Sequence, residues 1–186
     1  NLPKNIHFVF VSQWMKDIVD EDYSVKIPME YYSIINNPIN TEIFQYVKKD
    51  AEQRYHILSI RPYATRKYAN DLSVKCILEL SKRPDFKKFE ITMIGDGKLF
   101  DDVLAPLRGY ENVHILRTFL RQEEIYEYHK KNGIFLVPTR QDSQGVSKDE
   151  AMSSGLIPVT NDVTAIGEFV DASCGVLSPG EDYLDM

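Results

Sequence analysis

The stretch RQDSQGVSKDEAMSSG, residues 140–155, carries side chains that suit a ligand with both phosphate and hydroxyl groups. Asp142 could accept hydrogen bonds from the hydroxyls of a sugar, and Glu150 from those of a ribose. Gly145 lets the backbone approach a ligand closely, and the free N–H groups of residues 146–148 would face an anion at a helix start. We therefore treat this stretch as the first candidate site.

A purely structural interpretation uses the same residues. Ser147 and Glu150 match an S-x-x-E capping box, in which Glu150 would bond to the backbone of its own helix. Gly155 is a natural residue to follow a helix end, and Asp142 would then be a solvated loop residue. The stretch taken alone does not decide between the two interpretations.

A second loop, SIRPYATRKYANDL at residues 59–72, gathers positive charge after an apolar run. Arg61 stands at the end of the run, and Arg66 and Lys67 follow in the loop. Arginine and lysine there could hold a diphosphate. The alternative is a solvated basic loop in which Asn70 only caps the next helix. Arg66 alone fits this alternative better, whereas Arg61 and Lys67 together favour an anion site.

The segment MIGDGKLFDD, residues 93–102, offers a shorter turn. Gly95 and Gly97 flank Asp96 and resemble a shortened phosphate or nucleotide turn. A G-x-G pattern by itself is weak evidence. A tight turn in which Asp96 caps a helix explains it nearly as well.

The segment LRTFLRQEE, residues 116–124, is another connection between a predicted strand and a predicted helix. Thr118 and Phe119 could line a pocket for a base, through backbone groups and a ring face. Packing of Phe119 in the core is the simpler explanation for that residue.

The elements that must position these loops alternate along the chain. Apolar runs predict strands at 6–11, 31–36, 55–60, 89–95, 112–118, 133–139, 156–161 and 174–178. Helical patterns lie at 71–83, 97–109, 121–132, 147–155 and 165–171. Most strands are apolar on both faces, which is typical of a parallel sheet covered on both sides. The alternation predicts an α/β fold with a doubly wound sheet, whose ligands bind where strands lead into helices.

Composition narrows the class of protein. The 186 residues are 43% hydrophobic and 27% charged, with a net charge of −6. Because Lys and Arg never run longer than two, we expect no nucleic-acid partner. No apolar run approaches the ~20 residues of a membrane span, and no signal peptide opens the chain. Cys76 and Cys174 match no metal spacing, which fits a reducing cytoplasm.

Other residues that often do chemistry show no catalytic or metal-binding pattern. His7, His56 and His114 lie in strand patterns as core or edge residues, and His129 is predicted on a helix surface. Neither a Ser/His/Asp set nor a metal cluster emerges. The group Trp14, Met15 and Ile18 is interpreted as a packing stripe.

Taken in order, these segments resemble the C-terminal, nucleotide-sugar-binding domain of a family-four glycosyltransferase. Such enzymes retain anomeric configuration and have two Rossmann-like domains facing a cleft, the GT-B fold. VSQWMKDIV and IINNPINTEIF are similar to the segments that end the first domain and connect the two domains. SIRPYATRKYAND and MIGDGKL are similar to the family's G-R-x-x-x-x-K-G loop and V-G-D-G-P turn. DSQGVSKDEAMSSGLIPV is similar to E-G-F-G-x-x-x-x-E-A-M-A-x-G-x-P-V, the most specific motif.

The resemblance implies a role for each loop. Glu150 would bind the ribose of the donor nucleotide, and Asp142 the transferred sugar. Arg61 and Lys67 would stabilise the departing diphosphate, with Arg66 as the alternative to Lys67. The remaining donor-binding residues would be Gly95, Gly97, Thr118, Phe119, Ser143, Gln144, Gly145, Val146 and Ser147.

This sequence departs from the family's pattern at several positions. Asp142 is one methylene shorter than the usual Glu. Gln144 stands where an aromatic residue is usual, Tyr68 follows Lys67 in place of Gly, and Asn37 replaces the Gly of N-G-I-D. These changes leave the donor sugar and base open.

The resemblance also implies an organisation and partners. Residues 1–40 would end the N-terminal domain and form the interdomain segment, and residues 41–186 would be the nucleotide-sugar domain, truncated at its C-terminus. The chain starts without Met, and we expect a fragment that transfers nothing alone. The donor would be UDP- or GDP-linked, with no metal or cofactor required. A glycan, lipid or protein acceptor would bind through the missing domain.

The full-length protein would then work in surface-glycan synthesis in the cytoplasm, with peripheral binding to the inner membrane face as an option. Two alternatives stay open. One is a domain that binds a nucleotide sugar or a protein partner without turnover. The other is a different GT-B enzyme, such as a nucleotide-sugar 2-epimerase, although the carboxylates and histidines it would need around the sugar do not appear as a set.

Overall fold

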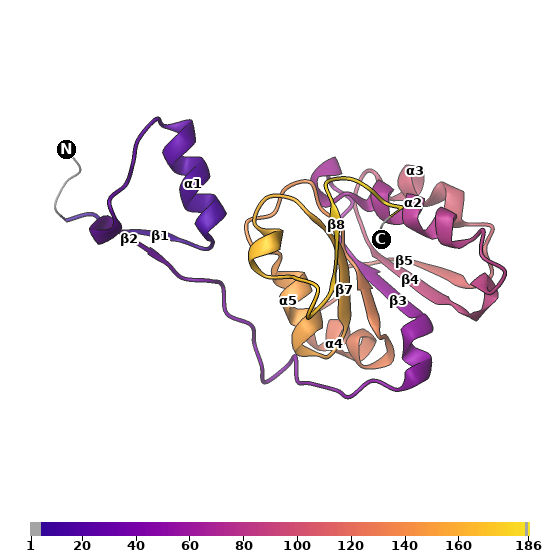
Figure 1. The fold of residues 1–186 in the computed structure, drawn as a ribbon. Helices are drawn as coiled ribbons and strands as arrows, with labels where there is room; N and C mark the ends of the chain where they lie inside the picture. The colour runs from indigo at the N-terminus through magenta and orange to yellow at the C-terminus, as the bar shows by residue number, and fades with distance from the viewer. Residues whose placement is uncertain (1–4, 185) are drawn as a thin grey trace.

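The computed structural model describes residues 5–184 and 186, and its main feature is a six-stranded sheet (Figure 1). Residues 1–4 and 185, which belong to the two predicted units, lie outside the described residues. The strands are β3 (His56–Ile60), β4 (Glu90–Gly95), β5 (Val113–Arg117), β6 (Ile134–Leu136), β7 (Ile157–Asp162) and β8 (Val176–Pro179). Their order is β5-β4-β3-β6-β7-β8, and each neighbouring pair is parallel.

This order is that of a doubly wound Rossmann-like sheet, which confirms the predicted fold class. From β3 the chain adds β4 and β5 on one side, and then returns to add β6, β7 and β8 on the other. The winding therefore reverses between β3 and β6. In such sheets ligands usually bind beside the loops that leave the C-terminal ends of the two strands at the reversal.

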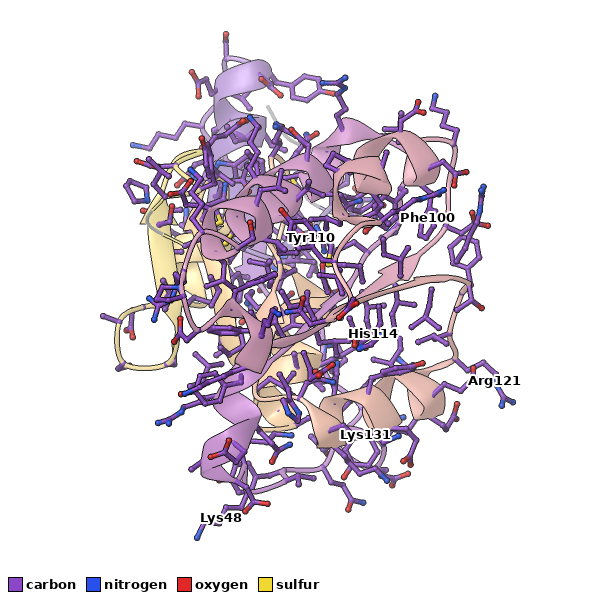
Figure 2. All side chains as sticks on the ribbon, turned by 90° about the vertical axis from the view of Figure 1, so that its right-hand side faces the viewer. Lys48, Phe100, Tyr110, His114, Arg121 and Lys131 are labelled. Atoms are coloured by element: carbon purple, nitrogen blue, oxygen red, sulfur yellow. The ribbon has the colours of Figure 1, made fainter. Side chains whose placement is uncertain are left out.

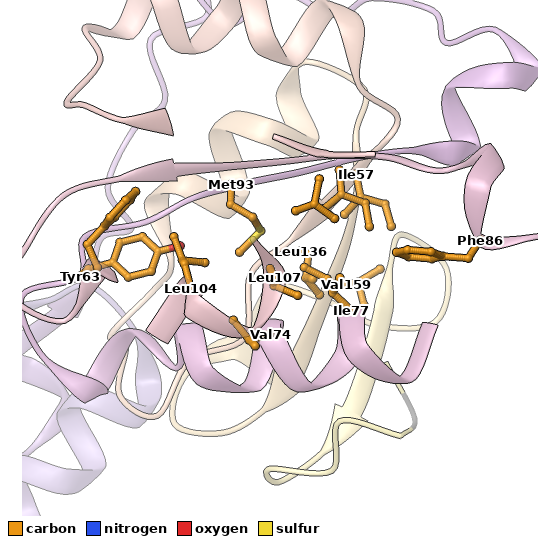
Figure 3. Close-up of a cluster of buried hydrophobic side chains, with 13 residues drawn as sticks. Ile57, Tyr63, Val74, Ile77, Phe86, Met93, Leu104, Leu107, Leu136 and Val159 are labelled. Carbon is orange, nitrogen blue, oxygen red and sulfur yellow. The ribbon is translucent and has the colours of Figure 1, made fainter. Parts of the chain in front are cut away.

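Helices cover both faces of the sheet because successive strand residues point to opposite sides. On one face α2 (Asn70–Leu80) and α3 (Phe100–Leu104) pack over a cluster that includes Ile57 and Met93 (Figure 3). On the other face α4 (Gln122–Lys131) and α5 (Val146–Ser153) cover a cluster that includes Leu58. Figure 2 labels Arg121 and Lys131, which mark the two ends of α4.

Two of the predicted helices do not form as expected. The helical pattern at 97–109 divides into α3 and a 3-10 turn, Ala105–Leu107, because Pro106 lacks the N–H that would continue an α-helix. The prediction of a helix at 165–171 is wrong. Only the 3-10 turn Ile166–Glu168 forms there, since a few residues around Gly167 cannot offset the cost of starting a helix.

The N-terminal segment forms a small unit of its own beside the main sheet (Figure 1). Its strands β1 (Phe8–Phe10) and β2 (Tyr32–Ile34) pair with each other in parallel, and α1 (Gln13–Asp22) connects them. The Glu168 carboxylate accepts hydrogen bonds from the first amides of α1, those of Gln13 and Trp14, at 2.9 and 2.6 Å. This contact joins the unit to the main body.

His129 lies in the core, so its predicted place on a helix surface is wrong. Its ring is fully buried and packs against Phe44 and Phe135, with centroids 5.5 and 5.8 Å apart. Ser154 Oγ lies 3.1 Å from Nδ1. The neighbouring residues of α4 are mostly charged, so the sequence pattern did not indicate that His129 is buried. Burial lowers the pKa of His129 to about 4, and the positive charge of Lys49 contributes to the shift.

The buried His129 makes stability depend on pH. Its pKa is lower in the folded chain than in the unfolded chain, so its full contribution is present above about pH 6.5 and is lost as the pH falls toward 4. We expect a loss of up to about 3 kcal/mol in the free energy of unfolding. Urea unfolding at pH 7 and pH 4.5 measures it. His129→Gln should flatten the dependence, whereas a substitution at the exposed His7 should not. An unchanged slope in His129→Gln would contradict this assignment.

Candidate functional site

The loops after β3 and β6 meet where the winding of the sheet reverses. The backbone N–H of Arg140, after β6, donates to the carbonyl of Lys67, after β3, at 2.8 Å. The hydroxyl of Thr139 donates to the same carbonyl at 3.2 Å. The two loops therefore form one continuous rim, on which the cationic segment and the start of α5 lie together.

Arg61 is the central side chain of this rim. It is only 6% exposed, and its Nη1 donates to Ser147 Oγ on α5 at 3.2 Å. Its guanidinium stacks on the Tyr68 ring, 5.0 Å from the centroid. Nε and Nη2 are buried and have no hydrogen-bond partner within residues 5–184 and 186. Burial lowers the pKa of Arg61, while the Asp142 carboxylate opposes that shift.

An arginine with free, buried N–H groups can bind an anion. Arginine stays charged in proteins, and a buried donor without a partner costs about 1–3 kcal/mol, more for a charged group. A planar fork with free N–H groups at the reversal point can bind two oxygens of a phosphate. The sequence placed Arg61 at a strand end, but only the structure shows that most of its donors are uncommitted.

The start of α5 excludes the capping-box interpretation of Ser147 and Glu150. The helix begins at Val146, and Gly145 occupies the cap position with φ 84°, in the left-handed region. Glycine adopts this conformation without the penalty that a side chain would bring. At the other end Gly155, also with φ 84°, follows the helix as predicted.

Asp142 shapes the loop that leads into α5. Its Oδ1 accepts hydrogen bonds from the amides of Gln144 and Gly145, at 3.2 and 2.8 Å. The Gly145 amide is thus engaged within the loop. The amides of Val146 and Ser147 remain as helix-start donors that have no intrahelical partner. Asp142 itself is half-buried.

Glu150 lies one turn along α5 from Ser147 and is partly buried. Gln122 Nε2, at the start of α4, donates to Glu150 Oε1 at 3.3 Å. Burial raises the pKa of Glu150, the Gln122 hydrogen bond lowers it, and the Asp149 charge raises it. The contact joins the loop after β5 to α5.

Phe119, three residues before Gln122, is 72% exposed, and Thr118 is exposed as well. Core packing of Phe119, the simpler explanation from sequence, is therefore wrong. Its exposed ring is available for stacking, close in sequence to Gln122, which contacts Glu150.

Gly95 and Gly97 let the turn after β4 pack against the loop that carries Arg61. A Cβ at Gly95 would lie 1.9 Å from the Arg61 carbonyl oxygen, and one at Gly97 would lie 2.3 Å from the Tyr63 carbonyl carbon. Asp96 accepts from the Gly97 amide and from Arg117 Nε, both at 2.7 Å. The alternative role of Asp96 as a helix cap is wrong, because α3 begins only at Phe100.

The side chain of Gln144 points toward Asn37, which follows β2. It is 3% exposed, accepts from the Asn37 amide at 2.7 Å and donates to the Asn37 carbonyl at 3.0 Å. Its Nε2 also donates to Asp149. Gln144 therefore joins the Asn37 segment to the loop before α5. The two segments are far apart in sequence, so residue spacing could not indicate this contact.

A cavity of 630 Å³ separates this rim from α1. Lys67, Tyr68, Asp142 and Ser143 line one side. The predicted packing stripe of Trp14, Met15 and Ile18 lines the other. Lys67 is exposed, and its Nζ lies 5.0 Å from the Tyr68 ring centroid, so Arg61 and Lys67 both contact this ring. Arg66 is exposed too.

The structure thus brings together the positions predicted from sequence around β3, β6 and α5. Their roles toward a ligand stay predictions. Within the described part of the chain, no group of three His, Cys, Asp or Glu residues could hold a metal ion. Across residues 5–184 and 186, the helices are all too short or too polar to cross a bilayer.

Comparison with known proteins identifies the family. The model of a family described as glycosyl transferases group 1 matches residues 55–186, well over half of the chain. The chain belongs to this family. No curated protein sequence matches this group 1 glycosyltransferase chain.

Solved structures share the fold of this glycosyltransferase chain at low sequence identity. A G117R mutant of S. aureus TarM, in complex with fondaparinux, alpha-GlcNAc-glycerol and UDP, superposes with a TM-score of 0.76 at 16% identity, covering 96% of this chain and 35% of that one. WaaG, a glycosyltransferase involved in lipopolysaccharide biosynthesis, gives 0.72 at 18% identity, covering 95% and 51%. The pneumococcal O-GlcNAc transferase GtfA, in complex with UDP and GlcNAc, gives 0.65 at 16% identity, covering 96% and 36%. The chain therefore spans about a third to a half of their lengths.

The glycine turn of this glycosyltransferase chain allows a matched test of packing. Gly95→Ala should lower the free energy of unfolding by roughly 3 kcal/mol, because the new Cβ would collide with the Arg61 carbonyl. At Gly109 an added Cβ meets no described atom within 4 Å, so Gly109→Ala should change stability by less than about 0.5 kcal/mol. Urea unfolding of the two variants measures the difference between their midpoints. Equal midpoints would show that Gly95 does not support the Arg61 loop.

Proposed function

We propose that this chain is the donor-binding half of a retaining, family-four glycosyltransferase with the GT-B fold. The full-length enzyme would transfer a sugar from a UDP- or GDP-linked donor to a glycan, lipid or protein acceptor, in surface-glycan synthesis. The observation that carries the proposal is the buried Arg61 fork, with uncommitted N–H groups where the winding reverses. The UDP in the TarM and GtfA complexes supports a nucleotide donor.

The proposed chemistry follows from where negative charge develops. Cleavage of the sugar–phosphate bond leaves an additional charge on the β-phosphate of the leaving diphosphate. Arg61, Lys67 and the amides that start α5 would stabilise that charge from fixed positions. Preorganised donors of this kind are among the largest contributions to enzymatic rate, with roughly 10²–10³-fold for one contact.

The two carboxylates would hold the rest of the donor. Glu150, on the second turn of α5, would accept from the ribose hydroxyls, with Phe119 as the face on which a base could stack. Asp142 already binds its own loop through Oδ1, so its Oδ2 would accept from hydroxyls of the transferred sugar. We further propose that the enzyme works in the cytoplasm, where its two widely spaced cysteines would stay reduced.

The self-bonded Asp142 also favours one second candidate, a domain that binds a nucleotide sugar without turnover. The same carboxylate that shapes the loop is one methylene shorter than the family's Glu and reaches less far into the site. Donor hydrolysis or transfer by the full-length protein separates the two functions, since both require the same diphosphate site.

Replacing Arg61 should change nucleotide binding and folding stability in opposite directions. Arg61→Met removes a buried charge whose donors are mostly unpaired, so the free energy of unfolding should rise by about 1 kcal/mol or more. The same change should weaken binding of UDP, or of GDP if that is the nucleotide bound, by about 10- to 100-fold. Urea unfolding and isothermal titration with UDP, GDP and ADP measure the two effects.

Lys131→Met, at the C-terminal end of α4, serves as the control for loss of one positive charge. A wild-type chain that binds none of the three nucleotides at millimolar concentration would contradict the proposed function. So would an Arg61→Met variant that binds as tightly as the wild type.

A further inference from the structure

A second arginine on the same rim, Arg140, has all of its side-chain donors paired, unlike Arg61. The five N–H groups of the Arg140 side chain all donate hydrogen bonds. Nη1 and Nη2 bind the Asp71 carboxylate at 2.7 and 2.8 Å. Nε and Nη2 bind Glu181 at 2.8 and 3.0 Å. The hydrogen bond to Arg140 and its charge lower the pKa of Asp71.

The remaining donor reaches the cationic loop. Arg140 Nη1 donates to the carbonyl of Arg66 at 2.9 Å, and the Arg140 backbone N–H donates to the carbonyl of Lys67 at 2.8 Å. The short turn that displays Arg66 and Lys67 is thus held at two consecutive carbonyls by one residue of the neighbouring loop. Asp71, at the start of α2, fixes the guanidinium from the other side.

We infer that Arg140 is a positioning residue of the diphosphate site, an inference that rests on the proposed function. It makes no contact with the donor itself. It holds the Arg66–Lys67 turn in place, so that the ammonium or guanidinium of that turn meets the diphosphate beside Arg61. It also neutralises charge on Asp71 and Glu181, which would otherwise repel an anion nearby.

The geometry requires an arginine and not only a positive charge. A lysine has a single ammonium and cannot bind two carboxylates and a carbonyl in one plane. Arg140→Lys should therefore keep the net charge and release the turn. Arg83 provides a matched control, because its Nε and Nη2 bind the Asp85 carboxylate in a similar fork at 2.9 and 3.1 Å, beyond the other end of α2.

The test measures binding of UDP and UMP to the 186-residue chain by isothermal titration, with GDP and GMP used instead if the wild type prefers guanine. In Arg140→Lys the affinity for UDP should fall about tenfold, while that for UMP falls less, because the turn faces the second phosphate. Arg83→Lys should leave both affinities unchanged. Thermal unfolding of each variant reports its stability.

A double-mutant cycle identifies the route of the effect. If Arg140 acts through the turn, Arg140→Lys should cost less than about twofold once Lys67→Ala or Arg66→Ala is present. Full additivity with both alanine variants would overturn the positioning role, as would equal losses of UDP and UMP affinity. If the wild type binds nucleotide and Arg140→Lys binds equally well, only this inference fails. If the wild type binds none, the proposed function fails and this inference with it.

Discussion

The candidate site depends on one buried guanidinium whose hydrogen bonds are mostly unmade. Arg61 sits at the reversal between β3 and β6, gives one N–H to Ser147 and keeps Nε and Nη2 without a partner among the described residues. Burying a charge in this state costs stability, and a purely structural position would pair it or replace it. An anionic ligand that binds the fork removes that cost, so the energetics of the apo chain favour binding.

The surrounding residues hold this arginine and the adjoining turn in place. The absence of a Cβ at Gly95 lets the β4 turn pack against the Arg61 backbone. Asp142 folds the loop so that Gly145 can open α5 beside the guanidinium. Arg140 donates all of its side-chain N–H groups to Asp71, Glu181 and the Arg66 carbonyl. The side-chain donors of Arg140 are thus all paired within the protein, whereas those of Arg61 are not.

The sequence predicted the fold well because strands and helices are indicated by patterns of residues that are close together in the chain. Each of the eight apolar runs overlaps a strand, and alternation with helical patterns indicates a doubly wound sheet. Strand ends then locate the loops that can bind a ligand. What the sequence could not predict are partners far apart in the chain: Gln144 with Asn37, and Arg140 with Asp71. Local patterns also misassigned His129 and Phe119, whose burial is decided by packing.

The most direct test of the central claim follows the arginine side chains themselves. In an NMR titration of the ¹⁵N-labelled chain with UDP or GDP, the Nε–H resonance of Arg61, assigned with Arg61→Met, should shift as this N–H gains a phosphate acceptor and binding saturates. The Nε–H of Arg140, which already donates to Glu181, should change little. Saturable binding that leaves the Arg61 resonance unmoved would contradict the account.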